Sequence, residues 1–385
     1  MRSVLAALFF VPAVAIVPPK APAPLAWAQV TVSPQLVSDG ELADRQADLL
    51  ATCGVADAAL VRVAKRLVER KALGLPLLDP SSLGFAQRVE GEPHVWPRAW
   101  VVSARALDHE TTKKKLAEWR ASFKDLGERR CGVASGLAPD GTEIVAALAV
   151  DALAEMSALP MRARTGQWLE VAARLRVPAA SARVIVLGPT GEPRRVPTSF
   201  EAGRVRARFA PDRPGAFTVQ IVAEVATGPR PVLEARVFAD TEPPDALPIA
   251  PAPGEDAGDP AADAPARLTA MVNALRDAEG LAKVTREPSL DSVAALHARK
   301  MMEARTVGHD VGDGEPPRRL QSAGIFVRES GENVAHAATV PLAHRALWES
   351  PSHRANLLRA DFVRAGIGVA EDADGSVWVC EELVR

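Results

Sequence analysis

The sequence predicts a protein of several domains: an α+β region, a small all-β sandwich and a C-terminal α/β domain. Three observations support this architecture. The chain has 385 residues, more than one ordinary domain contains. Its central stretch alternates apolar and polar residues with the period of two typical of strands, whereas the flanking stretches show helical spacing. A segment rich in proline and acidic residues then separates the β-rich part from the C-terminal part.

The first 28 residues predict an export signal. Arg2 precedes an apolar run over residues 4–17, and Ala26 and Ala28 stand at the two positions that signal peptidase recognises. We therefore expect cleavage near Ala28 and a secreted or periplasmic protein. A membrane anchor is the alternative, but the run is shorter than the ~20 residues that a spanning helix needs. No later stretch approaches that length, so no transmembrane segment is expected in the mature chain.

Charge and cysteine content narrow the function classes. The formal net charge is −2, which gives no support to a nucleic-acid-binding protein. Cys53 and Cys131 fall in the same N-terminal region and could pair in an oxidising compartment, but the sequence does not decide this. Cys380 lies in an apolar run and is expected to be a small buried hydrophobic residue.

Residues 35–160 are expected to form the N-terminal α+β domain. Helical spacing predicts one helix over residues 44–71, with few breakers apart from Gly54, and another over residues 111–126. Two strands follow, at residues 132–134 and 143–150, joined by a Pro-Asp-Gly turn signal.

Residues 165–240 predict an antiparallel β-sandwich. Apolar and polar residues alternate at 204–209 and again at 217–223, and clusters of turn residues occur at 188–191 and 211–215. The strand, turn and strand around the second cluster resemble bacterial immunoglobulin-like domains. Such domains usually serve as spacers or interaction modules, so we assign no chemistry to this region.

An acidic linker over residues 241–264 leads into the C-terminal domain, residues 265–385. The linker is rich in Pro, Ala and Asp and cannot bury enough apolar surface to fold alone. Helical spacing returns at residues 268–278, and Gly280 stands where a helix C-terminal cap belongs.

The rest of this domain reads as helices followed by a hairpin. A second helix is expected from Pro288, with Ser289 as its N-cap and His297 on its apolar face. Three shorter helical segments follow, at residues 317–323, 341–348 and 351–358. Two final strands are expected at residues 365–370 and 376–383. This order predicts a layered α/β or α+β unit.

Five short motifs follow one another across residues 265–385. They are an opening helix at 272–281, Gly-His-Asp at 308–310, Gly-Glu-Asn at 331–333, Ser-Pro-Ser-His-Arg at 350–354 after Trp348, and Gly-Ile-Gly at 366–368. In this order they resemble the bacterial form of the CAP superfamily, which includes cysteine-rich secretory proteins, antigen 5 and pathogenesis-related proteins. The fourth motif departs from the family pattern: it is one residue shorter after the Trp and has Ser352 in place of Gly.

The resemblance implies an α-β-α sandwich with a cleft lined by histidine and glutamate. His309 and Glu332 match members of the characteristic tetrad of the family, and His353 lies where the bacterial version supplies a histidine. A fourth member often precedes the Gly-x-Gly strand, but here Val363 and Arg364 stand there. We expect His309, Glu332 and His353 on loops or helix ends.

The residue types themselves allow two kinds of chemistry. Two imidazoles and one carboxylate are ligands that zinc accepts, so His309, His353 and Glu332 form a candidate zinc set. The same groups serve general acid–base catalysis near neutral pH. The alternative is structural, because buried histidines and a glutamate can satisfy one another by hydrogen bonds alone. Asn333 is included in the candidate cleft, where it is expected to fix the loop around Glu332.

The remaining histidines are interpreted as structural or surface residues. His297 is expected to be a satisfied core histidine. His336 and His344 are expected at the surface or just outside the cleft, with His336 able to approach it. His94 and His109 are expected at the surface.

Three functions follow from this reading. The favoured one is a binding module for a lipid or sterol-like ligand, a cell-envelope component or a protein partner, as the family resemblance implies. The second is a metal-assisted hydrolase or peptidase that uses His309, Glu332 and His353. The third is a structural envelope protein with a filled, inactive cleft. The sequence names neither the ligand nor the metal.

The N-terminal region shows a parallel with the C-terminal one. The sequence of residues 130–134 and 139–145 is similar to that of residues 364–370 and 374–379. In both regions, these segments follow a helical stretch that carries a Trp. The region has no Gly-Glu-Asn and no Ser-Pro-x-His motif. We therefore interpret it as a degenerate CAP-like copy that has lost the chemistry of the cleft.

Overall fold

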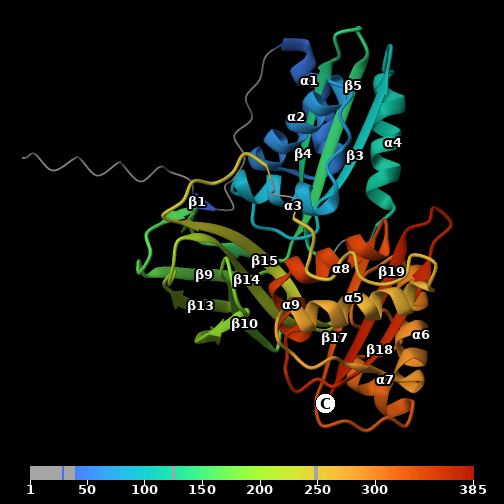
Figure 1. Cartoon of the computed structure of the whole chain (residues 1–385). Helices are drawn as coiled ribbons and strands as arrows, with labels where there is room; N and C mark the ends of the chain where they lie inside the picture. The colour runs from blue at the N-terminus through green and yellow to red at the C-terminus, as the bar shows by residue number, and fades with distance from the viewer. Residues whose placement is uncertain (1–27, 30–39, 124–125, 247–249) are drawn as a thin grey trace, which may run out of the picture.

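A computed structural model describes residues 28–29, 40–123, 126–246 and 250–385 of the protein (Figure 1). The predicted export signal, apart from Ala28, lies outside the described residues. Helices and strands combine into three units, which we call the N-terminal unit (residues 40–152), the β-sandwich (154–239) and the C-terminal unit (264–384). Within the described ranges, no helix is both long and apolar enough to cross a bilayer.

The N-terminal unit contains one four-stranded sheet and four helices. The helices are α1 (Gly40–Cys53), α2 (Ala58–Ala72), α3 (Pro80–Val89) and α4 (His109–Ala121). The strands are β2 (Val55–Ala56), β3 (Arg98–Ala104), β4 (Glu128–Leu137) and β5 (Glu143–Ala152). Their order in the sheet is β2-β4-β5-β3, with β2 parallel to β4 and the other pairs antiparallel.

The single helix predicted over residues 44–71 is wrong, because the chain breaks after Cys53. Asp57 caps a new helix by accepting hydrogen bonds from the backbone N–H groups of Ala59 and Leu60. The intervening residues pair with β4 as the short strand β2. The second predicted helix also ends earlier than residue 126, since α4 stops at Ala121.

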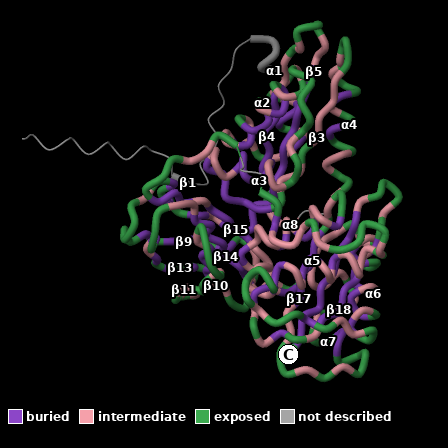
Figure 2. Tube along the Cα trace, in the orientation of Figure 1, coloured by how far each residue is buried: buried purple, intermediate pink, exposed green. Residues whose placement is uncertain are grey.

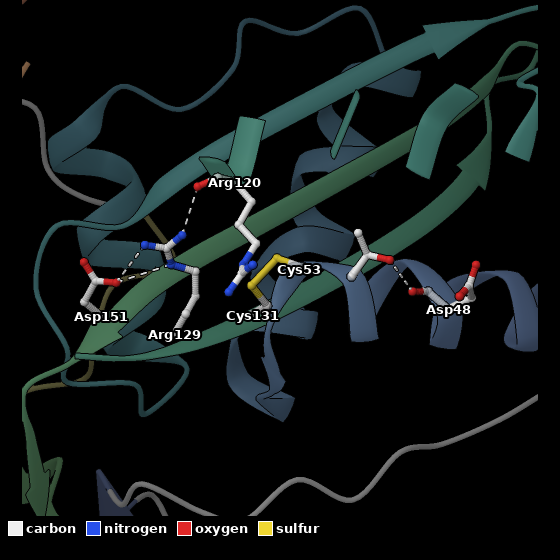
Figure 3. Close-up of a disulfide and its surroundings, with 7 residues drawn as sticks. Asp48, Cys53, Arg120, Arg129, Cys131 and Asp151 are labelled. Carbon is white, nitrogen blue, oxygen red and sulfur yellow. Dashed lines mark hydrogen bonds and ion pairs between the residues drawn. A yellow bond between two sulfur atoms is a disulfide. The ribbon is translucent and has the colours of Figure 1, made fainter. Parts of the chain in front are cut away.

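A disulfide joins the first helix to the sheet. Cys53, the last residue of α1, is bonded to Cys131 on β4, with a Cα–Cα distance of 5.9 Å, and both are buried (Figure 3). Beside it, Arg129 of β4 forms an ion pair of 3.2 Å with Asp151 of β5. The pairing that the sequence left open is therefore made in the structure.

Two sheets that share one apolar core form the β-sandwich. One sheet has the order β11-β10-β14-β15-β8 and the other β12-β13-β9-β6. The strands are β6 (Ala154–Met156), β8 (Arg162–Ala163), β9 (Leu169–Leu175), β10 (Ser181–Leu187), β11 (Arg194–Val196), β12 (Thr198–Glu201), β13 (Arg204–Phe209), β14 (Gly215–Val225) and β15 (Gly228–Ala239). A separate pair, β1 (Ala28–Gln29) and β7 (Leu159–Pro160), lies beside them. The predicted alternation is confirmed along β13, where every second residue is buried.

The C-terminal unit has three layers. Its helices are α5 (Ala264–Ala278), α6 (Pro288–Ala304), α7 (Pro316–Ser322), α8 (Val340–Glu349) and α9 (Pro351–Leu357). Its strands are β16 (Thr285–Arg286), β17 (Ser330–Ala337), β18 (Arg364–Glu371) and β19 (Val377–Val384), in the order β16-β18-β19-β17. Helices α5, α8 and α9 share a core with one face of the sheet, while α6 and α7 cover the other. Every residue of β19 is buried between these layers.

Two expectations about this unit are wrong in detail. Glu332 was expected on a loop, but it lies within strand β17, paired with β19. The N-cap of α6 is Glu287 and not Ser289. Pro288 explains the shift, because a proline is tolerated at the first helical position, where the missing N–H is not needed.

The sheets of the N-terminal and C-terminal units have the same strand order. In each, the first strand pairs in parallel with the third, and the order in space is first, third, fourth, second. Each third strand also carries a glycine against the backbone of a helix. A Cβ on Gly132 or on Gly366 would lie closer than 3.0 Å to the backbone of Leu60 or of Leu290, respectively. Only glycine fits such an approach.

The β-sandwich contacts both other units, through the ion pair of Glu234 with Arg88 and the hydrogen bond that Gln220 accepts from the backbone N–H of Ser352. Buried positions concentrate along the strands and inner helix faces (Figure 2).

Part of the predicted linker lies on the C-terminal unit, where Glu255 pairs with Arg345 of α8. His344 of the same helix was expected at the surface or just outside the cleft. It is buried, and its Nε2 lies 2.9 Å from the backbone oxygen of Pro253. A surface position is wrong, because the linker segment covers this histidine.

Candidate functional site

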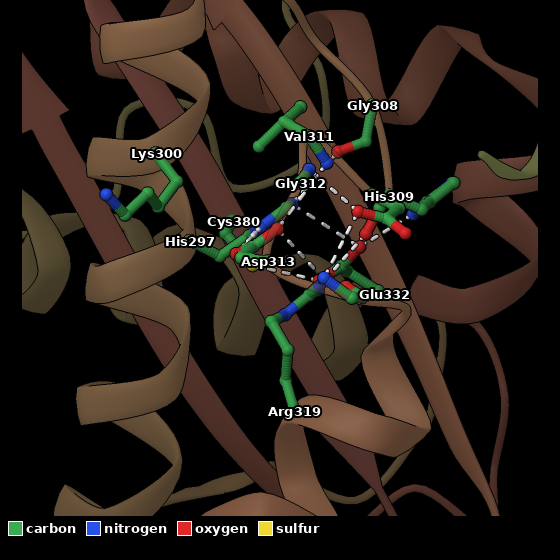
Figure 4. A network of polar contacts seen from close by, with 12 residues as sticks. His297, Lys300, Gly308, His309, Val311, Gly312, Asp313, Arg319, Glu332 and Cys380 are labelled. Atoms are coloured by element: carbon green, nitrogen blue, oxygen red, sulfur yellow. Dashed lines mark hydrogen bonds and ion pairs between the residues drawn. The ribbon is translucent and has the colours of Figure 1, made fainter.

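His309 and Glu332 meet in the C-terminal unit. His309 lies in the loop between α6 and α7, and its Nδ1 is 2.7 Å from Oε1 of Glu332 on β17 (Figure 4). The glutamate is buried, and the histidine side chain is 15% exposed. Two of the candidate residues, distant in sequence, are thus joined by a hydrogen bond.

Arg319 of α7 occupies the centre of this cluster. Its guanidinium donates to Oε2 of Glu332 and lies 3.5 Å from Oε1 of Glu382. It also donates to the backbone oxygens of His309 (2.6 Å) and Gly314. The arginine is buried, and it holds the loop that carries His309 against the strand that carries Glu332. Its role was not identified from the sequence.

The cluster carries a defined pattern of charge. Burial raises the pKa of Glu332, but the hydrogen bond and charge of His309, with Arg319 and His297, outweigh this and lower it to about 2. Burial and the neighbouring Glu332 charge raise the pKa of Glu382 well above its usual range. The two carboxyl groups therefore share one negative charge at neutral pH, which Arg319 balances.

Cys380 lies beside these carboxyl groups. Its Sγ is 3.4 Å from Oε2 of Glu332, and burial raises the pKa of the thiol well above its usual value. The prediction that Cys380 is buried is confirmed. Its surroundings are polar as well as apolar, because β19 also brings Glu382 to the cluster.

His297 of α6 contacts the loop that carries His309. Its Nδ1 lies 2.8 Å from Oδ2 of Asp313 and its Nε2 lies 2.9 Å from the backbone oxygen of Gly308. Its side chain is fully buried, 3.9 Å from Glu332. The prediction of a satisfied core histidine is confirmed, and its partners show that it positions the loop of His309.

His353 of α9 is the third candidate residue. It is half-buried, and burial together with the charge of His309 lowers its pKa to about 3, against the opposing effect of Glu332. The imidazole is therefore neutral at physiological pH. Asn333 connects its helix to β17: Nδ2 of Asn333 lies 3.4 Å from the backbone oxygen of His353 and 3.0 Å from Glu381, and Oδ1 accepts from Asn356.

The candidate zinc set does not fit this geometry. In the described part of the chain, the His, Cys, Asp and Glu groups that bring three ligand atoms within 4.8 Å of one another are Glu332, Cys380 and Glu382. His309 and His353 are not among them. The guanidinium of Arg319 already neutralises the carboxyl groups of that cluster, and the high pKa of Cys380 keeps its thiol protonated. A zinc ligand would have to be deprotonated.

A cavity of about 440 Å³ opens beside His353. All three units line it, with residues that include Trp96, Phe123, Arg230, His336, His353 and Trp378. His309 and Glu332 are not part of its wall. The sequence motifs pointed to His353 but not to the walls contributed by the N-terminal unit and the β-sandwich.

Three further histidines have defined partners. His336 stacks on Trp378 with ring centroids 4.1 Å apart and is exposed at the cavity, as its sequence interpretation allowed. His94 was expected at the surface, which is wrong. It is buried between Glu92 and the backbone oxygen of Ala154, 2.9 Å from its Nε2. His109 is partly exposed and bonded to Asp48.

Comparison with known proteins addresses the C-terminal unit. Residues 269–381 match the CAP family model, described as the cysteine-rich secretory protein family. The uncharacterized protein YkwD of Bacillus subtilis (strain 168) is 28% identical over 114 residues, which are 29% of this chain and 44% of that protein. The chain thus spans less than half the length of this relative.

Two solved structures are also similar to this chain. An outer surface protein from Borrelia burgdorferi is 24% identical, with 31% of this chain and 90% of that chain covered and a TM-score of 0.29. An extracellular protein containing a SCP domain from Bacillus anthracis str. Ames is 16% identical, with 61% and 86% covered and a TM-score of 0.29. With the five motifs and the family model in agreement, the C-terminal region of this chain is a bacterial CAP-superfamily domain.

Proposed function

We propose that this chain is an exported binding protein whose CAP domain contributes one wall of a ligand cavity. The observation that carries the proposal is the cavity of about 440 Å³ beside His353, which lies within the size range of small-molecule sites. The apolar N-terminal run and the Ala26–Ala28 pattern support export. The extracellular relative from Bacillus anthracis agrees with that location.

The arginine in the His309–Glu332 cluster argues against a metal-assisted hydrolase. Such an enzyme needs an open coordination position with a water and a carboxylate that is free to take its proton. Here both oxygens of Glu332 are engaged, by His309 and by Arg319. Its pKa of about 2 also makes it a weak base. The cluster is better suited to holding the walls of the domain rigid.

One observation favours the structural alternative for the cleft itself. The first residue of β15 packs on His309: a Cβ on Gly228 would lie 3.0 Å from the Cβ of the histidine. This contact covers the histidine from the side of the β-sandwich. The cavity beside His353 is separate from this contact and remains the basis of the proposed binding.

The N-terminal unit and the β-sandwich receive supporting roles in this proposal. The strand order shared by the two four-stranded sheets, and the helix-facing glycines Gly132 and Gly366, support a degenerate CAP-like copy at the N-terminus. The two sheets around one core support an immunoglobulin-like spacer between the copies. Both units add walls to the cavity.

A neutral fluorescent probe tests the binding proposal. N-phenyl-1-naphthylamine gains fluorescence in apolar sites, and the oxidised full-length protein should bind it saturably. Ala346 lines the cavity from α8, so Ala346→Trp should fill the space and weaken binding by about tenfold or more, the equivalent of two or three buried methylenes. Ala278→Trp, at the exposed end of α5, is the matched control and should bind like the wild type. Absence of saturable binding by the wild type would favour the structural alternative.

A further inference from the structure

We infer that the cavity binds a small amphipathic anion, a molecule with one carboxylate or phosphate group on an apolar body. This inference rests on the proposed binding function and adds the chemical class of the ligand. Its basis is Arg230 of the β-sandwich, whose guanidinium lines the cavity with no carboxylate of the described residues at salt-bridge distance.

Arg230 has unused hydrogen-bonding capacity. Its guanidinium lies 4.5 Å from the ring centroid of Trp96, and Nη2 lies 3.4 Å from the backbone oxygen of Val307. A guanidinium carries five N–H donors arranged to match a carboxylate or phosphate. Burial lowers the pKa of Arg230 to about 10, against the opposing charge of Asp151, and the group stays charged at neutral pH. An anion in the cavity would supply the partner that the described residues do not.

Other arginines at the cavity already have partners. Arg88 lies 3.0 Å from Glu234 and Arg98 lies 3.2 Å from Asp151. Arg305 at the far rim pairs with Asp372. Arg236 lies over the ring of Phe85, and the charge of Glu234 acts on it. Each of these guanidinium groups thus has a partner within the protein, whereas Arg230 has no carboxylate of the described residues at salt-bridge distance, so its N–H donors are the ones that a ligand would meet.

The acidic and imidazole groups of the wall do not cancel this charge. Glu234 is held by Arg88 and accepts a hydrogen bond of 2.9 Å from Gln220. Burial raises the pKa of Glu349, against the opposing charges of Arg236 and Arg345, which are the arginines that this carboxyl group faces. Burial also lowers the pKa of His353 to about 3 and lowers that of His336, so both imidazoles are neutral at physiological pH.

Trp96 provides a second, independent sign of a binding site. Its backbone has φ 56°, a left-handed conformation that costs energy for a bulky side chain, and the residue is 41% exposed and lines the cavity. Such strained residues concentrate at ligand sites. The strained backbone presents the indole beside Arg230, and Phe123, Val334 and Leu347 extend the apolar wall. An apolar body attached to the anionic group fits this wall.

Two probes that differ by one charged group test the inference on the full-length protein. 8-Anilino-1-naphthalenesulfonate carries the ring system of N-phenyl-1-naphthylamine plus a sulfonate. The wild type should bind the anionic probe about tenfold more tightly than the neutral one, as a charge-assisted hydrogen bond allows. Arg230→Met keeps the aliphatic stem and should abolish that preference, so that this variant binds the two probes with equal affinity.

Arg183→Met is the matched control. Arg183 is another arginine of the β-sandwich whose pKa is lowered by burial, but it does not line the cavity. This variant should keep the full preference for the anion. Equal affinities of the wild type for the two probes, or equal losses in Arg230→Met and Arg183→Met, would overturn the inference. Failure of the neutral probe to bind would instead overturn the proposed binding function.

Competition against the anionic probe identifies the chemistry without any variant. Decanoate and decyl phosphate should displace it at concentrations at least tenfold below those of decanol, and whichever is stronger identifies the head group. Inorganic phosphate should be much weaker than decyl phosphate, since it lacks the apolar body. Equal potency of decanol and the two anions would contradict a charged site, and equal potency of inorganic and decyl phosphate would contradict an amphipathic one.

Discussion

At the scale of single residues, Arg319 decides what the His309–Glu332 cluster can do. A divalent cation bound to Glu332 and Glu382 would need the position that its guanidinium holds. The arginine also donates to the backbone of the loop that carries His309. It therefore acts as a built-in cation that sets the position of the histidine.

Replacing Arg319 should destabilise the C-terminal unit. Arg319→Met removes the partner of a buried carboxylate, so the free energy of unfolding should fall by about 3–5 kcal/mol, as for other broken buried ion pairs. Urea denaturation followed by circular dichroism measures this change. Arg318→Met, at the exposed neighbouring position on α7, should cost little. Equal stability of the two variants would mean that the ion pair does not hold the loop.

The neutral state of His353 predicts a pH dependence of stability. Its pKa is lowered by burial from 6.5 to about 3, so between these values the unfolded chain binds a proton that the folded chain does not. The histidine therefore contributes stability above pH 6.5 that is lost as the pH falls toward 3. His353→Gln should flatten the melting temperature over this range relative to the wild type. Parallel curves for the two proteins would show that His353 titrates normally.

The sequence could identify a residue's role only where its interaction partners lie close to it in the sequence. His309, Glu332 and His353 were found through short motifs, which also contain Asn333. Arg319 lies in the same region, but its interaction with Glu382 joins positions 63 residues apart. His94 was misassigned to the surface, and the burial of His344 was not predicted, because their backbone carbonyl partners are 60 and 91 residues away. A lone histidine gives no local signal of such a contact.

At the scale of elements, the close contact of β18 with α6 sets the spacing of the CAP layers. A Cβ on Gly366 or on Gly368 would lie closer than 3.0 Å to the helix backbone near Leu290 or Ala294. The Gly-Ile-Gly motif thus allows the helix to rest directly on the strand. Leu290 and Ala294 are themselves fully buried there.

A single methyl group should disturb this contact. Gly368→Ala forces α6 away from the sheet, so the free energy of unfolding should fall by about 1–3 kcal/mol, the usual cost of overpacking. Thermal unfolding followed by circular dichroism gives the change. Gly308→Ala is a suitable comparison, because its Cβ would meet only atoms at 3.8 Å and its φ is not positive. If both variants melted alike, the contact with the helix would not be the reason for the glycine.

Element positions were predicted well where the signal was local. The helices of the C-terminal unit and the hairpin at its end follow the apolar spacing and the proline residues. The strand β17 was missed because its Gly-Glu-Asn sequence contains poor strand formers, and its pairing with β19 supplies what propensity does not. The break between α1 and α2 was missed because Asp57 acts as a cap only once β2 has paired with β4.

At the scale of the whole molecule, the family of the C-terminal unit was predictable and the cavity was not. Ordered motifs over residues 265–385 identified the CAP domain. The cavity is lined by residues from Pro80 to Trp378, which belong to parts of the chain with different apolar cores. The hydrophobic periodicity of one segment cannot predict a cavity that forms only when other segments pack against it. The two halves of the chain also share a strand order that the sequence suggested only through a weak parallel.

Because all three units line the cavity, ligand binding has a thermodynamic consequence. A molecule bound where Trp96, Arg230 and His353 meet touches all three units at once, so its binding energy is lost if any one of them separates. Occupancy would then tie their melting into a single cooperative transition and raise its temperature with the logarithm of ligand concentration. Without a ligand, the three units would unfold in separate transitions, and with a ligand bound they would unfold together.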